Sequence, residues 1–219
     1  MTMTTTTATT SEETTLNPAI HAAFRRDLAR FDNAFDLFEP DDQRRAAQLG
    51  AAWENYSYQL HRHHQDEESF FWPAFRELGV DESIVDALDG EHEVMVAALT
   101  EADAAVRAFV PGPTADNAKT ARLAVAELNR ILCDHLAHEE RDLDPFSVRH
   151  KKTAQHKAAE SATRKAHTEG IGAFFAWLCD GCDSDAARVL HSEVPRPVLW
   201  VITRVGGRDY NRRIAPVWN

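Results

Sequence analysis

The sequence predicts an all-α protein: an up-down-up-down four-helix bundle followed by a helical C-terminal extension. Two observations carry this prediction. Apolar residues recur at spacings of three and four along most of the 219-residue chain, and no strand-like alternation interrupts them. Proline and glycine break this pattern near Pro40, Gly79 and residues 111–113, which leaves four long segments with short connections. Helices joined in this way pack most simply as antiparallel neighbours.

The four predicted helices each carry one apolar stripe, and they cover residues 17–39, 41–78, 81–110 and 114–146. Asn17 is the expected N-cap of the first helix, because proline follows it at the first helical position. Pro73 falls inside the second segment, where we expect it to kink the helix or to end its regular part. The stripes are predicted to contain Phe24, Leu28, Phe31, Phe35 and Phe38 in the first helix, Leu49, Trp53, Tyr56, Leu60, Phe70 and Ala74 in the second, Val85, Leu88, Met95, Leu99, Val106 and Phe109 in the third, and Val125, Leu128, Leu132, Leu143 and Phe146 in the fourth.

Three regions of different composition divide the chain. Residues 1–15 contain nine threonines and are predicted to be a disordered tail. Residues 16–148 contain the bundle, and residues 149–219 form the extension. In the extension we expect a fifth helix over residues 150–179 and a short apolar helix around residues 198–205. The extension either packs on the bundle as an appendage or forms a contact between subunits.

Composition and charge exclude several functional classes. The chain has 35 acidic and 24 basic side chains, and a net charge of −11 argues against non-specific nucleic-acid binding. No apolar run approaches the roughly 20 residues that cross a bilayer, so we expect no membrane partner. Three cysteines cannot build a disulfide framework, and the first 15 residues contain no apolar secretory segment. We therefore expect a cytoplasmic protein.

Histidines and glutamates interrupt the apolar stripes of all four predicted helices. Seven of the eleven histidines lie in residues 1–140, which contain 26 acidic side chains against 11 basic ones. Burying such groups without partners costs about 1–3 kcal/mol for each polar group and far more for an isolated carboxylate. Metal ions remove this cost by giving every lone pair a partner. The candidate ligands are His21, His63, Glu67, His92, His135 and Glu139.

The spacing of these candidate ligands suits metal binding. His63 and Glu67 are four residues apart, as are His135 and Glu139, so each pair lies on one helix face. Both side chains of a pair can then reach one ion, or a carboxylate can bridge two. Imidazole with carboxylate suits iron, manganese or zinc better than calcium or magnesium. One histidine on an apolar stripe is more often a core residue, but two such pairs on different helices, with stripe histidines on the other two, predict a two-metal site.

The motifs around these residues resemble the signatures of hemerythrin-like (HHE cation-binding) domains, over about residues 17–146. The resemblance implies a four-helix bundle around two non-heme iron ions, with an oxo or hydroxo bridge, two bridging carboxylates and histidines as terminal ligands. The matching segments are HHQDEE at residues 63–68 with FFWP at 70–73, HLAHEE at 135–140 with LDP at 143–145, His21, and EHE at 91–93.

The sequence departs from the oxygen carriers of that family in two places. Their third helix supplies a His-x-x-x-His pair, whereas His92 has Leu88 and Val96 at those spacings. Their last helix places an aspartate five residues after its histidine; here that position is Glu140, although the phase of the stripe favours Glu139. One ion then either has an open position or takes a further ligand, for which the candidates are His64, Tyr56 and His61. His138 is expected to be solvated or to support a ligand from outside.

An open position favours chemistry with a small molecule over reversible oxygen carriage. The first hypothesis is a di-iron protein that reacts with dioxygen, peroxide or nitric oxide and uses a redox partner that the sequence does not identify. The second is a module that binds, stores or senses oxygen or iron without turnover, and the third is a structural bundle with a static metal or none. We expect Cys179 and Cys182, a lone C-x-x-C pair, to be incidental, and the basic run at residues 149–152 to be a solvated face.

Overall fold

The computed structural model describes residues 14–218, where helices are the regular secondary structure and no strand occurs. The predicted all-α class is therefore confirmed. Of the predicted N-terminal tail, residues 1–13 lie outside the described part of the chain. Within residues 14–218, none of the helices combines the length and the apolar character needed to span a lipid bilayer.

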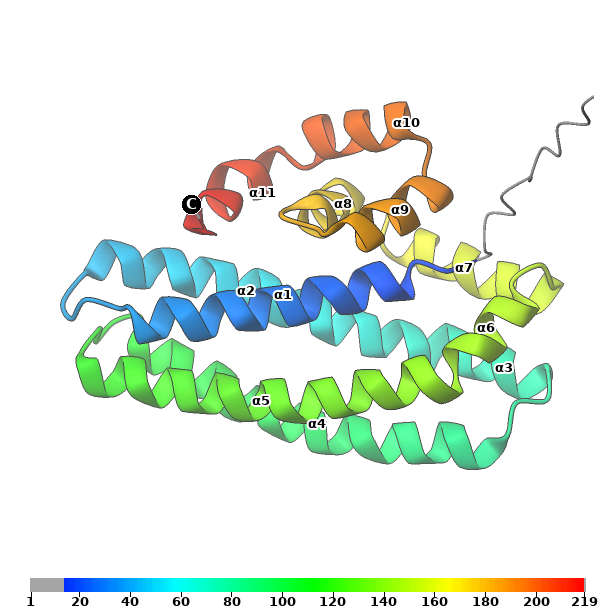
Figure 1. Cartoon of the computed structure of the whole chain (residues 1–219), viewed down its shortest axis with the longest axis horizontal. Helices are drawn as coiled ribbons and strands as arrows, with labels where there is room; N and C mark the ends of the chain where they lie inside the picture. The colour runs from blue at the N-terminus through cyan, green and yellow to red at the C-terminus, as the bar shows by residue number, and fades with distance from the viewer. Residues whose placement is uncertain (1–13, 219) are drawn as a thin grey trace, which may run out of the picture.

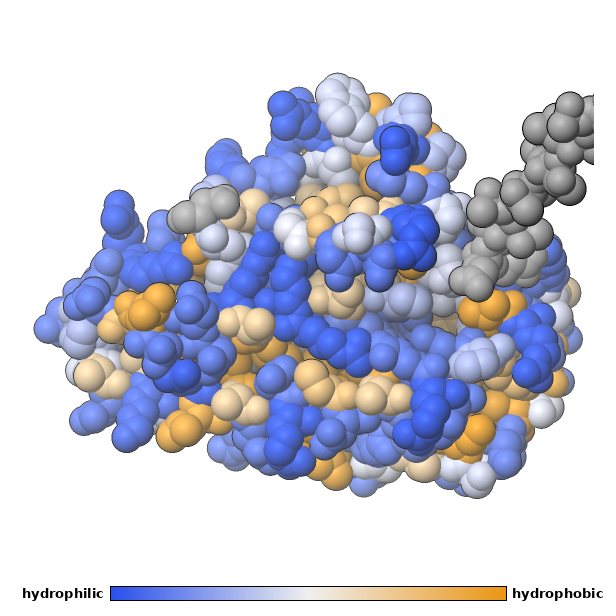
Figure 2. Space-filling view, viewed as in Figure 1, coloured by the Kyte–Doolittle hydropathy of each residue, from blue (hydrophilic) through white to orange (hydrophobic). Residues whose placement is uncertain are grey.

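Four long helices lie side by side along the length of the molecule (Figure 1). In this arrangement α4 contacts α5 and α2, while α1 contacts α5 and α2. Figure 2 shows that hydrophilic side chains cover most of one face of these helices, and the apolar stripes face inward. The four helices are α1 (Asn17–Asp36), α2 (Gln43–Asp66), α4 (Glu82–Phe109) and α5 (Ala115–Asp142).

Polar side chains begin three of these helices at the predicted breaks. Asp42, Asp81 and Thr114 each accept a hydrogen bond from a backbone N–H in the first turn of the helix that follows. The first helix differs from the prediction, because its N-cap is Leu16 and not Asn17. The Asn17 side chain points instead to a buried glutamate, as described below.

The second predicted segment stays helical, but its regular α-helical part ends at Asp66, before Pro73. A single π-helical turn (Glu67–Phe71) follows α2 and leads into the short helix α3 (Trp72–Glu77). Proline has no N–H to donate to the carbonyl four residues earlier, and a π-turn relieves that conflict by inserting one residue. The insertion shifts the helix phase, so the predicted burial of Phe70 and Ala74 is wrong and Trp72 and Phe75 are buried in their place. Phe38 and Phe146 are also only partly buried.

The C-terminal extension consists of short helices that lie across one side of α1 and α2 (Figure 1). The single helix predicted over residues 150–179 is wrong, because the chain turns at Gly170, whose φ of +91° suits glycine. The short apolar helix expected around residues 198–205 is present as α10 and a π-turn. The elements are α6 (Asp144–His150), α7 (Ala154–Ala166), α8 (Ile171–Cys179), α9 (Ser184–Glu193), α10 (Arg196–Val201), η2 (Ile202–Gly206), α11 (Arg208–Arg213) and η3 (Ala215–Trp218).

The extension shares one hydrophobic core with the long helices. The ring of Trp177 in α8 lies 5.1 Å from that of Phe24, and the ring of Trp218 lies 5.0 Å from that of Phe31. The extension therefore packs on the long helices. An apolar row on the outer side of the extension stays exposed; it consists of Val198, Trp200, Val201 and Val205.

Candidate metal centre

All six candidate ligands point into the interior between the long helices. Helix α1 carries His21, α2 carries His63, and the π-turn carries Glu67. The side chains from α4 and α5 complete the set. None of the six is more than 8% exposed, and they are His21, His63, Glu67, His92, His135 and Glu139.

These side chains and His64 form two groups, each able to hold a metal ion. In each group the ligand atoms lie within 4.8 Å of one another. Glu67 belongs to both groups, so its carboxylate stands between two potential ion positions. The first group contains His21, His63, Glu67 and Glu139; the second contains His64, Glu67, His92 and His135.

The structure places the three candidates for a further ligand in different surroundings. His64 is buried and joins the second group. Tyr56 is buried among aromatic rings, and Phe24 contacts both it and His63. His61 is exposed, and its Nδ1 lies 3.0 Å from the carbonyl oxygen of Ser57.

Of the two adjacent glutamates of α5, Glu139 faces inward and Glu140 faces outward. Glu139 is 3% exposed and lies in the first group. Glu140 accepts two hydrogen bonds from Arg25, at 2.6 and 3.1 Å, and its Oε1 lies 2.9 Å from Nδ1 of His21. The preference for Glu139 that the stripe indicated therefore agrees with the placement of the two side chains.

Carboxylates outside the centre hold three of the imidazoles by their outer nitrogens. Nδ1 of His21 lies 2.9 Å from Glu140, and Nδ1 of His135 lies 3.0 Å from Glu91. In the same way Nδ1 of His92 lies 2.9 Å from Glu68. An imidazole bound at Nδ1 in this way directs Nε2 inward, and its basicity as a ligand rises.

Other polar residues support the centre without entering either group. Asn17 donates hydrogen bonds to Glu139 at 2.9 Å and to Asp144 at 3.1 Å. Nδ1 of His138 lies 2.7 Å from Glu91, so His138 supports the outer carboxylate of His135. Sequence reasoning assigned Asn17 to helix capping and missed this contact, since nothing in the local pattern shows which helix faces its side chain.

The inner atoms of the two groups are buried and lack hydrogen-bond partners among the described residues. They include Nε2 of all five histidines, both carboxylate oxygens of Glu67 and Oε2 of Glu139. Nε2 of His63 lies 3.1 Å from Glu67 Oε1, and Nε2 of His21 lies 3.3 Å from Glu139 Oε2. Buried polar atoms almost always have a hydrogen-bond partner. So many nitrogen and oxygen atoms that face one another without a hydrogen bond fit a pair of metal ions, which would bind them as ligands.

The pKa values in the centre show how crowded its charges are. Burial opposes the protonation of His21, but Glu139 and Glu140 outweigh it and raise its pKa to about 9. Burial and the nearby His21 lower the pKa of His63 to about 3. Burial, reinforced by Glu139, raises the pKa of Glu67 well above its usual value. The raised pKa values of His21 and Glu67 mean that these side chains hold protons in the centre. Metal ions would supply the same positive charge and displace these protons.

One family of proteins matches this chain in sequence. The model of the hemerythrin HHE cation-binding domain matches residues 18–147, which is more than half of the chain. The chain belongs to the hemerythrin family. The domain binds cations, and the two His/Glu groups of this hemerythrin-like protein could hold them. No curated protein and no solved structure matches the chain.

Helix α4, the third of the four long helices, carries His92 but lacks the second histidine found in the family's oxygen carriers. In this hemerythrin-like protein another helix brings an imidazole close to His92. The ring of His64, on α2, lies 4.3 Å from that of His92 and 5.7 Å from that of His135. The second group therefore contains three imidazoles and one carboxylate, whereas the first contains two of each. The two groups therefore differ in the chemistry that they offer a metal ion.

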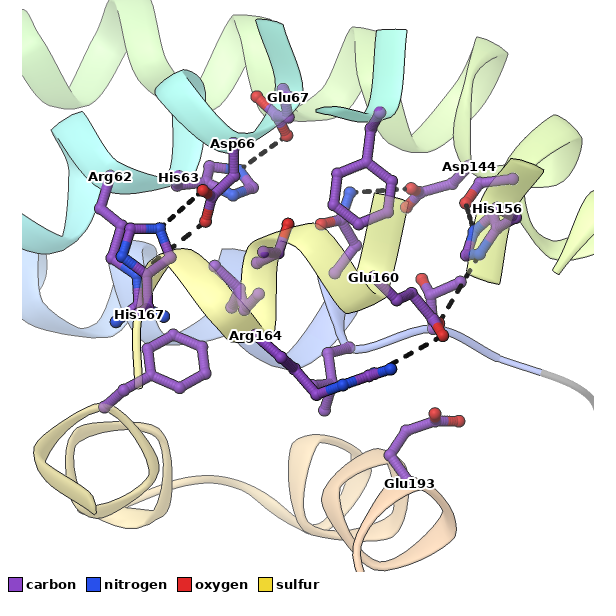
Figure 3. Close-up of a pocket in the computed structure, with 18 of the residues that line it drawn as sticks. Arg62, His63, Asp66, Glu67, Asp144, His156, Glu160, Arg164, His167 and Glu193 are labelled. Atoms are coloured by element: carbon purple, nitrogen blue, oxygen red, sulfur yellow. Dashed lines mark hydrogen bonds and ion pairs between the residues drawn. The ribbon is translucent and has the colours of Figure 1, made fainter. Parts of the chain in front are cut away.

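A cavity of about 520 Å³ lies between the long helices and the extension (Figure 3). Its lining includes His63, Glu67 and Glu139 of the first group. Helices α7, α8 and α9 contribute the opposite side. The cavity therefore connects the first group, rather than the second, with space large enough for a small molecule.

The two cysteines of the C-x-x-C pair and the basic run at residues 149–152 lie outside the candidate metal centre. Cys179 and Cys182 are free and half-buried, and burial raises the pKa of both thiols. Lys151, from the basic run that was expected to be solvated, instead pairs with Glu193 and lines the cavity.

Proposed function

We propose that this hemerythrin-like protein holds two iron ions inside an up-down-up-down bundle of its four long helices. His21, His63, Glu67 and Glu139 would hold the first ion, and His64, Glu67, His92 and His135 would hold the second, so that Glu67 is available to both. The observation that carries this proposal is the set of buried, unpaired donor atoms in two groups that share Glu67.

We further propose that the iron pair reacts with a small oxygen or nitrogen species, namely dioxygen, peroxide or nitric oxide. Iron supplies the exchange of electrons that such chemistry needs. The protein supplies the route and the surroundings: the cavity is lined by His63, Glu67 and Glu139, so a small molecule inside it would reach the residues of the first group. Apolar walls such as Phe71 and Phe175 limit the entry of water. A cytoplasmic location fits the free cysteines.

Metal analysis of paired variants tests the ligand assignment. Because Glu67 belongs to both groups, Glu67→Ala should lower the iron content of both positions, from two ions per chain towards none. His92→Ala should affect the second position first. His61→Ala is the matched control, since His61 lies on the same helix but is exposed. Two firmly bound ions in Glu67→Ala would contradict the proposal.

Turnover measurements separate the reactive protein from a binding module. Steady consumption of peroxide or nitric oxide by the iron-loaded protein, absent in Glu67→Ala, supports the proposed reaction. A visible absorption that appears in air, persists, and disappears under vacuum supports oxygen binding without turnover. Bound iron with neither behaviour supports storage or a structural ion.

A further inference from the structure

The cavity beside the iron centre has the composition of a binding site for an organic molecule. Its volume of about 520 Å³ is far larger than dioxygen or nitric oxide requires and falls within the range of ligand pockets. Much of its wall is apolar or aromatic. The apolar part includes Ile20, Phe71, Phe75, Ile171, Phe174 and Phe175.

Most charged side chains of the cavity have a partner within the protein. Lys151 pairs with Glu193 at 2.5 Å, and Arg164 lies 3.8 Å from Glu160. Asp66 lies 2.7 Å from Nε2 of His167. Figure 3 shows Asp66 and His167 together at one end of the cavity and His156 and Glu160 towards the other. These pairs leave little unbalanced charge at their positions.

Arg62 is the exception. It lines the cavity and is only 9% exposed. Its Nη1 has no hydrogen-bond partner among residues 14–218. The closest carboxylate, that of Asp66, lies 3.9 Å from its Nε and is already engaged by His167. Its guanidinium carbon lies 4.8 Å from the ring of Phe174. Asp66 and the side chain of Tyr58 compensate the Arg62 guanidinium only in part, because burial still lowers its pKa. A buried guanidinium of this kind attracts an anion, and its planar fork suits a carboxylate.

We propose that the cavity binds an amphipathic organic monocarboxylate, with its carboxylate on Arg62 and its apolar body against the phenylalanines. A single anionic group is expected because Arg62 is a buried cation of the lining with only a long ion pair, whereas Arg164 is exposed to solvent. Asp144, Glu160 and Glu193 would repel a second anionic group. Arg62 directly precedes His63, so the bound molecule lies beside the iron-binding groups. Its role as a substrate for the iron pair rests on the proposed function, whereas its binding does not.

Calorimetric titration of the full-length, iron-loaded protein with octanoate tests this proposal, with octan-1-ol as the uncharged match. We expect one octanoate per chain, and Arg62→Gln should weaken its binding about tenfold or more, because a hydrogen-bonded charge pair is lost. Octan-1-ol should bind Arg62→Gln and the native protein alike. Arg164→Gln is the control: it removes the same charge from the same cavity, but at an exposed and paired position, and should change octanoate affinity less than about twofold.

A second variant keeps the test decisive if Arg62→Gln does not fold. Val194 lines the cavity from the extension and belongs to neither metal-binding group, so Val194→Trp should fill the cavity and abolish octanoate binding. The proposal is overturned if the native protein shows no saturable octanoate binding, or if Arg62→Gln weakens octanoate and octan-1-ol equally. It is also overturned if octanoate affinity follows the iron content and not Arg62. Measuring the iron content of the same samples separates the two proposals. Protein that contains iron but does not bind octanoate would refute only the carboxylate site. Protein that binds octanoate but takes up no iron would refute only the iron pair.

Discussion

Trp177 in α8 donates a hydrogen bond from Nε1 to Oδ2 of Asp27 in α1, at 2.7 Å, and both side chains are buried. Oδ1 of the same carboxylate accepts hydrogen bonds from Arg26 at 2.8 Å and Arg30 at 3.1 Å. One aspartate thus ties the extension to the first long helix. The same helix carries His21, so the contact also connects the extension with a helix of the candidate metal centre.

Removal of this aspartate should destabilise the fold. Asp27→Ala leaves the Trp177 N–H and the buried guanidinium of Arg26 without their main partner, so we expect a loss of about 2–4 kcal/mol in the free energy of unfolding, measured with urea. Asp32→Ala is the control, because the Asp32 side chain is 48% exposed and pairs with Arg122 near the surface; it should stay within about 0.5–1 kcal/mol of the native protein. Equal urea midpoints for the two variants would show that the buried contact contributes nothing.

Close contact between two glycines gives a second prediction. A Cβ on Gly172 in α8 would lie 2.3 Å from the backbone of Gly206 in η2. Gly172→Ala should therefore destabilise the protein by about 1–3 kcal/mol. Gly90→Ala provides the opposite case, since Gly90 is an exposed residue of α4 with no atom near its missing Cβ; it should stabilise the protein by about 0.5–1 kcal/mol. Thermal melting of both variants checks the two signs, and a stable Gly172→Ala would exclude the tight crossing.

An outer carboxylate should control iron affinity without touching the metal. Glu91 holds His135 and His138 by their Nδ1 atoms, at 3.0 and 2.7 Å. Glu91→Ala frees the His135 ring, and we expect iron affinity to fall about 10–100-fold in competition with a chelator. Glu93→Ala removes the same charge from the exposed side of the same helix and should leave affinity unchanged. If both variants lose iron equally, net charge rather than imidazole orientation is responsible.

The thiol of Cys179 should react slowly in the folded protein. Burial, together with Cys182, raises its pKa from 9.0 to about 11, and only the thiolate is nucleophilic. At pH 8 the thiolate fraction is then about 100-fold below that of an unshifted thiol, and alkylation should accelerate as the pH rises towards 11. Mass spectrometry after timed labelling with iodoacetamide, with urea-unfolded protein as the reference, measures the difference. Rapid labelling of the folded protein at pH 8 would instead indicate an activated thiol.

The spacing of apolar residues along each helix predicted which side chains of the long helices are buried. Most of the apolar residues predicted for the stripes of α1, α4 and α5 are buried, because spacings of three and four are a property of one helix. The prediction failed where the phase changed: the π-turn before Pro73 exchanged Phe70 and Ala74 for Trp72 and Phe75. It also failed at Gly170, where a positive φ divides one expected helix into two.

The sequence by itself determined the helical class, the family and the inward position of the six candidate ligands. Each of these depends on local sequence, namely apolar spacings of three and four along one helix and the motifs around the histidines. Only the tertiary structure decided that His64 joins His92 and His135, that Glu67 lies in both groups, and that α7 to α9 enclose a cavity beside Arg62. These relationships join residues from different helices. Their geometry follows from how the helices pack, which no local spacing records.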